Sequence, residues 1–168
     1  WSAGRAMALP AATPTLAPAR SGVGVACRFG GANVLVSREE IREIMVVPPT
    51  TRVPGARAWV RGLANVRGQL LPLIDLNAFG GGDATAVGRT TRVIWVNHRT
   101  VPAGLLVDEV FGFRRFARSG RLAPDADAAS QPLSEHLTGV FAAGEERWPV
   151  LGLQGIVESD AFLQAAEA

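Results

Sequence analysis

Short apolar runs separated by turn residues dominate the chain from residue 23 onward. Residues 23–29 alternate loosely between apolar and polar side chains, residues 30–33 make a turn, and residues 34–36 resume the apolar pattern, which predicts a β-hairpin. Similar runs occupy residues 44–47, 62–66, 70–74, 93–96, 105–107, 110–113, 139–143 and 148–151. Many short strands with Gly and Pro between them are typical of all-β sandwiches and barrels.

Helical periodicity is confined to the end of the chain. Ser159 is a candidate N-cap for a short helix over about 159–166 that carries Phe162 and Leu163. A helical turn or two is also compatible with residues 38–43 and 56–60. Residues 1–22 are rich in Ala and Pro without periodicity, and we expect a flexible tail there.

The sequence contains an internal repeat, because residues 62–76 align with 139–153 without a gap. The alignment pairs Pro72 with Pro149, and we expect both on edges or bulges because proline cannot donate to a ladder. A second likeness joins residues 33–36 to 102–107.

The repeat predicts two copies of about five strands, the first barrel over about 23–79 and the second over about 89–153, joined by a loop at 80–88. A copy of about 60 residues is marginal alone. We therefore expect the halves to pack on each other, with a groove or shared face between them.

Composition restricts the classes of function. The chain is 48% hydrophobic and 19% charged, enough to build a core, and no apolar stretch is long enough to cross a bilayer. All 17 basic residues are arginine, so the high pI accompanies a net charge of only +2, which does not imply nucleic-acid binding. The single cysteine, Cys27, excludes an internal disulfide and fits a reducing cytoplasm.

Catalytic motifs are scarce. The absence of lysine excludes a P-loop and Schiff-base chemistry. Cys27, His98 and His136 are isolated in sequence; we interpret Cys27 as a small buried hydrophobe and His98 as an exposed loop residue. Asp108 and Glu109 are neighbours in a predicted strand, so they would point to opposite faces and cannot act as an acid/base pair. The sequence predicts no catalytic residue, cofactor or metal.

Interleaved aromatics and arginines fill residues 111–121. They suit stacking on bases and pairing with phosphates, or else a strand edge with a solvated basic rim, which the low net charge favours. A nucleic-acid-binding barrel is the alternative function, and a small hydrolase using Cys27 or a histidine is a third.

Residues 61–75, RGLANVRGQLLPLID, resemble the signature of CheW-like coupling domains, in which a Gly-x-x-Asn-x-Arg-Gly turn precedes an apolar strand ending in Asp. Residues 41–44, 51–54 and 104–110 match further family motifs in order, so the resemblance covers about 23–163. Trp59 and Trp148 resemble the PilI-like branch, which serves type IV pilus twitching motility.

The resemblance implies an all-β fold of two five-stranded SH3-like barrels. It also implies a cytoplasmic adaptor without an active site, placed at membrane-bound chemoreceptor arrays. Such an adaptor links the cytoplasmic tip of a methyl-accepting chemoreceptor to the regulatory domain of a CheA-type histidine kinase, and its signalling belongs to a two-component system.

The same resemblance assigns site residues. The receptor-facing residues would be Ile41, Glu43, Asn65 and Arg67. Two glycines, Gly62 and Gly68, would hold the turn that presents Arg67, and Leu105 and Val107 near the barrel rim would contact the kinase.

Arg67 has two open interpretations. Its guanidinium can reach a partner's carboxylate or helix C-terminal carbonyls, or it can pair with Asp75 or another acid of its own barrel. The second copy has Gly152 in place of Asp75 and lacks the Asn and Arg of the first turn. We therefore place the binding function on the first copy's turn.

Overall fold

A computed structural model describes residues 21–117, 121–123, 132–143 and 145–167. The predicted tail lies outside the described residues apart from its last two positions, which belong to the first strand.

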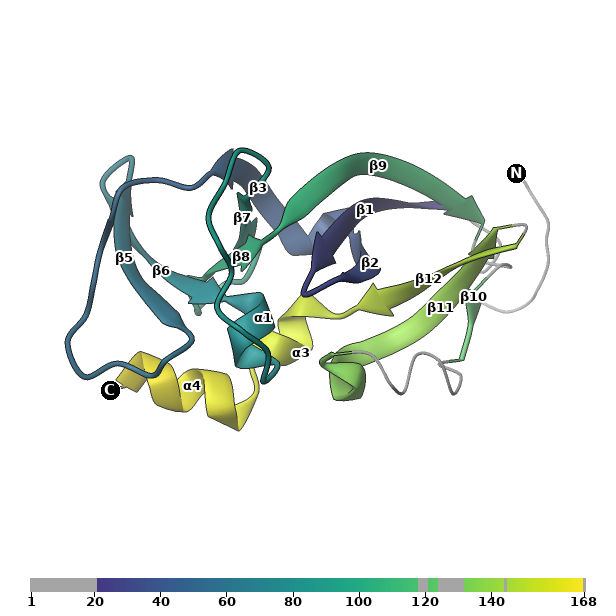
Figure 1. Cartoon of the computed structure of the whole chain (residues 1–168). Helices are drawn as coiled ribbons and strands as arrows, with labels where there is room; N and C mark the ends of the chain where they lie inside the picture. Colours follow the sequence, from purple (N-terminus) through teal and green to yellow (C-terminus); the bar gives the residue numbers. More distant parts are fainter. Residues whose placement is uncertain (1–20, 118–120, 124–131, 144, 168) are drawn as a thin grey trace.

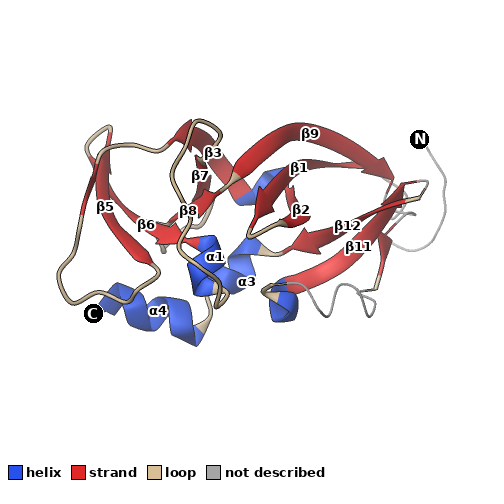
Figure 2. Ribbon diagram, in the orientation of Figure 1, coloured by secondary structure: helices blue, strands red, loops and turns tan. Residues whose placement is uncertain are grey.

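The described strands form two six-stranded sheets that lie side by side (Figures 1 and 2). We call the first the terminal sheet, because it uses both ends of the chain; its order is β10-β11-β12-β2-β1-β9. Its strands are β1 (Ser21–Phe29), β2 (Ala32–Ser37), β9 (Glu109–Ala117), β10 (Arg121–Leu122), β11 (Leu137–Ala143) and β12 (Glu146–Leu151). The second, the middle sheet, has the order β3-β7-β8-β6-β5-β4. Its strands are β3 (Ile41–Val46), β4 (Thr50–Thr51), β5 (Val60–Val66), β6 (Gln69–Asp75), β7 (Arg92–Val96) and β8 (Gly104–Val107).

Each sheet consists of five longer strands and one two-residue strand, β4 or β10. This arrangement confirms the predicted all-β class with two barrel-like halves. The longer strands also coincide with the apolar runs in the sequence, because a half-buried strand requires alternating side chains.

The internal repeat has a structural counterpart. The antiparallel hairpin β5–β6 and the hairpin β11–β12 are each followed by a short helix. β6 then pairs in parallel with β8, and β12 pairs in parallel with β2. The likeness between residues 33–36 and 102–107 therefore reflects equivalent positions in the two sheets.

The predicted division of the chain between the barrels, 23–79 and 89–153, is wrong. β1 and β2 do not join the strands that follow them; β1 pairs with β9 and β2 with β12. The described strands of the middle sheet all come from residues 41–107. The repeat identifies equivalent elements, but it does not indicate which copies of them share a sheet.

Pro72 and Pro149 were expected on edges or bulges, but both lie in interior strands at regularly paired positions, next to the register shift of their hairpin. Pro72 precedes Leu73, the first residue of β6 that pairs with β8. Pro149 likewise precedes Val150, the residue of β12 paired with β2. Each proline thus lies where its strand is paired on one side only. Its missing N–H therefore costs no ladder hydrogen bond on the other side.

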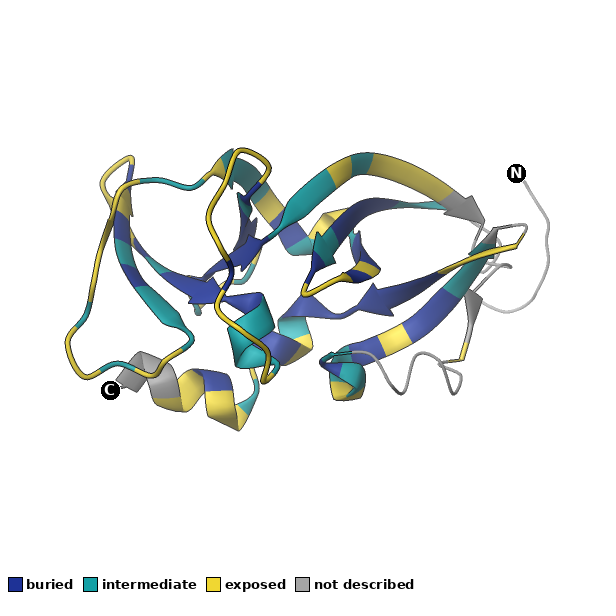
Figure 3. Cartoon of the chain, in the orientation of Figure 1, coloured by how far each residue is buried: buried dark blue, intermediate teal, exposed yellow. Residues whose placement is uncertain are grey.

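The largest hydrophobic cluster lies between the sheets, where Figure 3 shows the buried colour concentrated. In β8, Leu105 and Val107 enter this shared core, while Leu106 enters a smaller cluster on the other face of the middle sheet. In β2, Val34 and Val36 enter the shared core, and Leu35 enters a small cluster on the other face of the terminal sheet. Strands buried on both faces carry continuous apolar runs.

The predicted C-terminal helix is confirmed as α4 (Asp160–Glu167). Ser159 Oγ accepts a hydrogen bond from the Phe162 amide at 3.4 Å, as expected of an N-cap. Phe162 is buried against Trp59 and Phe79, with ring centroids 6.1 and 5.7 Å away, so α4 docks on the middle sheet (Figure 1).

The other helices are short. In the described part of the chain they are α1 (Leu76–Phe79), α3 (Leu153–Val157) and the 3-10 turns η1 (Arg38–Glu40) and η3 (Ser134–His136). The predicted turn at 38–43 is therefore helical only over η1, and residues 56–60 form turns leading into β5. Among the described residues, no helix has both the length and the apolar character to span a membrane.

Candidate partner-binding site

The hairpin turn between β5 and β6 presents Arg67 to solvent. Arg67 and Gly68, its two central residues, have φ values of 48° and 85°, as a type I′ turn requires. Asn65 Oδ1 accepts a hydrogen bond from the Gly68 amide at 3.0 Å and braces the turn. A non-glycine residue at positive φ is uncommon, and Arg67 is the less favourable of the two for this conformation.

Arg67 is held by a carboxylate of β3. Its guanidinium donates to both oxygens of Glu43, with Arg67 Nη1 3.3 Å from Oε2. The hydrogen bond from Arg67 lowers the pKa of Glu43 below its ordinary value, with a further Coulombic contribution from the same guanidinium. The Arg67 pKa is raised in turn, chiefly by the same bond. Arg67 nevertheless keeps 65% of its side chain exposed, so the pair remains accessible.

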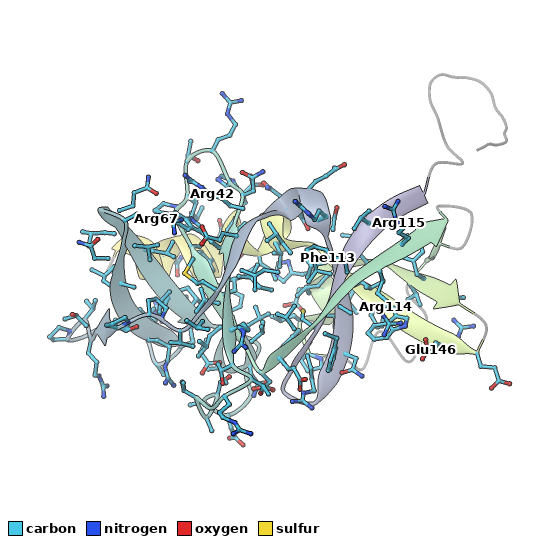
Figure 4. The ribbon with its side chains drawn as sticks, turned by 90° about the horizontal axis from the view of Figure 1, so that it is seen from above. Arg42, Arg67, Phe113, Arg114, Arg115 and Glu146 are labelled. Carbon is cyan, nitrogen blue, oxygen red and sulfur yellow. The ribbon has the colours of Figure 1, made fainter. Side chains whose placement is uncertain are left out.

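Two guanidiniums lie over one indole beside this ion pair. Trp95 of β7 pairs with Glu43 in the ladder, and its ring centroid is 4.4 Å from the Arg42 guanidinium carbon and 5.7 Å from that of Arg67. We call Arg42, Glu43, Asn65, Arg67 and Trp95 the turn cluster; Figure 4 labels its two arginines. Sequence reasoning missed Arg42 and Trp95, because only the register of β3 with β7 brings them to the turn.

Two of the residues predicted for this site have other roles. Ile41 is buried in the shared core with 7% exposure, so its side chain supports β3 and does not face a partner. Gly62 does not hold the turn. It lies at a β-bulge of β5 with φ 143°, where a Cβ would collide with the Thr51 carbonyl oxygen. Gly68 holds the turn as predicted.

The predicted kinase contacts, Leu105 and Val107, are not at a rim. Both side chains are fully buried in the shared core, so the prediction that they meet a partner is wrong. An apolar run in a strand cannot distinguish a rim from a strand buried on both faces. The structure offers Leu70 instead, which is 64% exposed in β6 and pairs with Asn65 across the hairpin.

Asp75 is not the partner of Arg67. Its buried carboxylate accepts from the Thr85 amide at 2.6 Å, from Thr85 Oγ1 at 2.7 Å and from the Ala78 amide at 3.2 Å. Arg61 Nη1 lies 3.9 Å from it. Asp75 therefore caps α1 and fixes the loop after it, while Arg67 pairs with the other acid of its sheet, Glu43.

The remaining candidates for catalysis have structural roles. Cys27 is fully buried on β1, and burial raises the pKa of its thiol to about 12, which removes it as a nucleophile. Asp108 accepts from the Gly30 amide, whereas Glu109 pairs with Arg28, so the two acids serve different partners. No group of metal-ligating side chains occurs within the described ranges.

His98 is not the exposed loop residue that was predicted. Its side chain is 9% exposed, and Nε2 lies 2.8 Å from Glu158 Oε2. Nδ1 accepts from the amides of Thr100 and Val101 at 3.1 and 3.0 Å. The imidazole thus ties the β7–β8 loop to the end of α3.

Comparison with solved structures identifies the fold. The scaffolding protein TtCheW from Thermoanaerobacter tengcongensis superposes with a TM-score of 0.74 over 84% of this chain and 95% of its own, at 18% identity. The two-sheet arrangement is thus that of a known scaffolding protein.

Sequence comparison identifies the family. A sequence model of the CheW-like domain matches residues 24–161. Protein PilI of Pseudomonas aeruginosa is 37% identical over 145 residues, covering 85% of this chain and 79% of PilI. Protein FrzA of Myxococcus xanthus is 30% identical over 118 residues, covering 69% of this chain and 71% of FrzA. The chain belongs to the CheW-like family, whose scaffolding proteins are non-enzymatic adaptors.

Proposed function

We propose that this chain couples the cytoplasmic tip of a methyl-accepting chemoreceptor to the regulatory domain of a CheA-type histidine kinase. The family match supports the adaptor role, and the identity with protein PilI supports a chemosensory system that controls type IV pilus twitching motility. We place the protein in the cytoplasm, at membrane-bound receptor arrays. Individual affinities of about micromolar suffice there, because an array supplies multivalency.

The observation that carries this proposal is the conformation of Arg67. An Asn-Gly pair would occupy a type I′ turn with less strain, yet this turn has Arg-Gly with the arginine largely exposed. Backbone strain that persists at an exposed position is typical of a functional residue. The turn cluster also has two guanidiniums against one carboxylate, and this excess suits a helical hairpin tip that carries acidic side chains.

We assign receptor contacts to Arg42, Glu43, Asn65 and Arg67. For the kinase regulatory domain we propose Leu70, because it is an exposed apolar side chain on a rigid strand next to the turn. Exposed apolar side chains on rigid strands are suitable anchors for a barrel-to-barrel contact.

Substituting Arg67→Asn tests the receptor surface without disturbing the hairpin. Asn tolerates positive φ and favours the type I′ turn before Gly68, so the free energy of unfolding should be unchanged or slightly higher. Affinity for the receptor's cytoplasmic fragment should fall about tenfold or more, measured by titration calorimetry. An unchanged affinity would show that the turn cluster is not the receptor surface.

Two further variants complete the design. Arg57→Asn changes an exposed arginine between β4 and β5 and should leave both affinities unchanged. Leu70→Ser should weaken binding of the kinase regulatory domain while receptor binding is retained. Equal losses for both partners would place Leu70 in a structural role.

A further inference from the structure

β9 forms one edge of the terminal sheet. It pairs with β1 along one side, and no described strand pairs with its other side. The register shifts at Ala26/Cys27, and Gly112 has φ 120° beside Phe111. An open strand edge presents a row of backbone N–H and C=O groups that another strand can pair with.

Aromatic and basic side chains line this edge. Phe111 is 43% exposed and Phe113 is 63% exposed, and Arg114 and Arg115 follow as exposed residues. The Arg38 guanidinium of η1 lies 5.8 Å from the Phe113 ring centroid. We call these five residues the β9 strip. Charges and a bulge are enough to guard an edge against pairing, so two exposed phenylalanines need another explanation, and anchoring a partner provides it.

The arginines of the β9 strip have no carboxylate partner in the described part of the chain, whereas neighbouring Arg28 pairs with Glu109. Arg114 lies 5.1 Å from the Trp148 ring centroid, and Arg115 points to the opposite side of β9 (Figure 4). Arginines without an ion pair among the described residues therefore lie on both sides of β9, and Glu146, which accepts from Trp148 Nε1 at 3.4 Å, is an acid on the Arg114 side. A complementary strand would need acidic side chains.

The chain's own N-terminal residues do not provide this charge. Residues 1–20 precede Ser21, which pairs with Ala117 of β9. They contain Arg5 and Arg20 but no Asp or Glu. The positive charge of the strip is complementary to an acidic segment, and the occupant that we consider is a segment of another protein.

We propose that the β9 strip is a second docking surface, which binds an acidic polypeptide segment as an added strand on the open edge of β9. Phe111 and Phe113 would anchor its apolar side chains, and Arg38, Arg114 and Arg115 would pair with its carboxylates. A strand satisfies the backbone groups of the edge, which a nucleic acid cannot do. The strip belongs to the terminal sheet and the turn cluster to the middle sheet, so this inference goes beyond the proposed function.

The test measures binding of the full chain to a fluorescent peptide that alternates glutamate and valine, by anisotropy near physiological salt. Arg115→Glu and Phe113→Ser should each weaken binding about tenfold or more, because both side chains are exposed and leave the core intact. The matched control Arg57→Glu should change it less than twofold. Equal weakening by Arg115→Glu and Arg57→Glu would reduce the effect to net charge and overturn the proposal.

A second probe tests strand pairing. The same peptide with alternate amides N-methylated keeps its charge but loses the N–H donors along one side of its backbone. Its affinity should fall at least tenfold. Equal affinity of the two peptides would overturn strand addition. Tighter binding of an oligodeoxythymidylate than of the acidic peptide would also overturn the proposal, in favour of nucleic acid. Arg67→Asn should bind the peptide normally, so failure here is distinguishable from failure of the receptor assignment.

Discussion

Arg67 and Glu43 hold each other across the tip of the middle sheet, 24 positions apart in the sequence. The turn at Arg67 and Gly68 is predictable, because a glycine-containing pair between two apolar runs indicates a hairpin. The partner of Arg67 is not predictable in the same way. The sequence indicated Asp75 or another acid of the same barrel, and only the placement of β3 beside the hairpin selects Glu43.

Glu43 provides a pH test at this scale. Its pKa is lowered in the folded state, so the stability gained from the pair is present above the unfolded carboxylate's pKa and is lost as pH falls through the folded pKa. We expect a carbon-detected NMR titration to place the Glu43 pKa below that of an ordinary glutamate. In Arg67→Ala the pKa should return toward the ordinary value. An identical pKa in both proteins would contradict the bond as its cause.

The Cys27 thiol gives a second prediction. With a pKa of about 12 and no exposed surface, it stays protonated at neutral pH and is inaccessible. A disulfide reagent such as DTNB should leave the native protein unmodified and should label the thiol once the chain is unfolded. Rapid labelling of the native chain would show that the Cys27 thiol is accessible and reactive.

At the scale of elements, the two copies of the repeat cap the helix after their hairpin in different ways. Asp75 caps α1 from the adjacent position, but its counterpart Gly152 has no side chain to cap α3. Glu40, far away in η1, accepts from the amides of Leu153 and Gln154 at 3.1 and 2.9 Å. The strands were predictable from alternation. Helices of four or five residues, such as α1 and α3, contain too few turns to show a period.

Removing this distant cap should destabilise the protein. Glu40→Ala leaves two helix amides without an acceptor, and we expect a loss of about 1–2 kcal/mol in the free energy of unfolding, measured by urea denaturation. The control is Glu39→Ala, where only the backbone carbonyl is engaged, by Asn97 Nδ2 at 3.2 Å. Its change should stay within about 0.5 kcal/mol. Equal losses of unfolding free energy for Glu40→Ala and Glu39→Ala would show that Glu40 does not cap α3.

At the scale of the whole molecule, the shared core couples the sheets. Leu105→Ala removes a fully buried side chain from this core, and we expect a loss of about 2–5 kcal/mol. Amide exchange measured by mass spectrometry should show protection falling in both sheets together. Loss confined to the middle sheet would show that the sheets unfold independently.

The grouping of strands into sheets is the part of the fold that the sequence did not indicate. Local patterns report whether a segment is half-buried, and the repeat reports which segments are equivalent. Pairing of β12 with β2 joins residues more than a hundred positions apart, at a single register contact between Val150 and Leu35. No pattern within either strand encodes that choice.

This connectivity also determines when each part can form during synthesis. The middle sheet uses one continuous stretch, so its strands can pair as soon as β8 has left the ribosome. The hairpin β1–β2 precedes the middle sheet in the chain, yet its neighbours β9 and β12 both follow that sheet. The apolar strand β1 therefore lacks its β9 partner until the middle sheet has been synthesised, and pairing β12 with β2 closes the largest sequence separation among the described strand pairs. We expect pairing of β9 and β12 with the hairpin β1–β2 to be the slow step of folding. Until then the hairpin exposes apolar side chains, and a chaperone is most needed there.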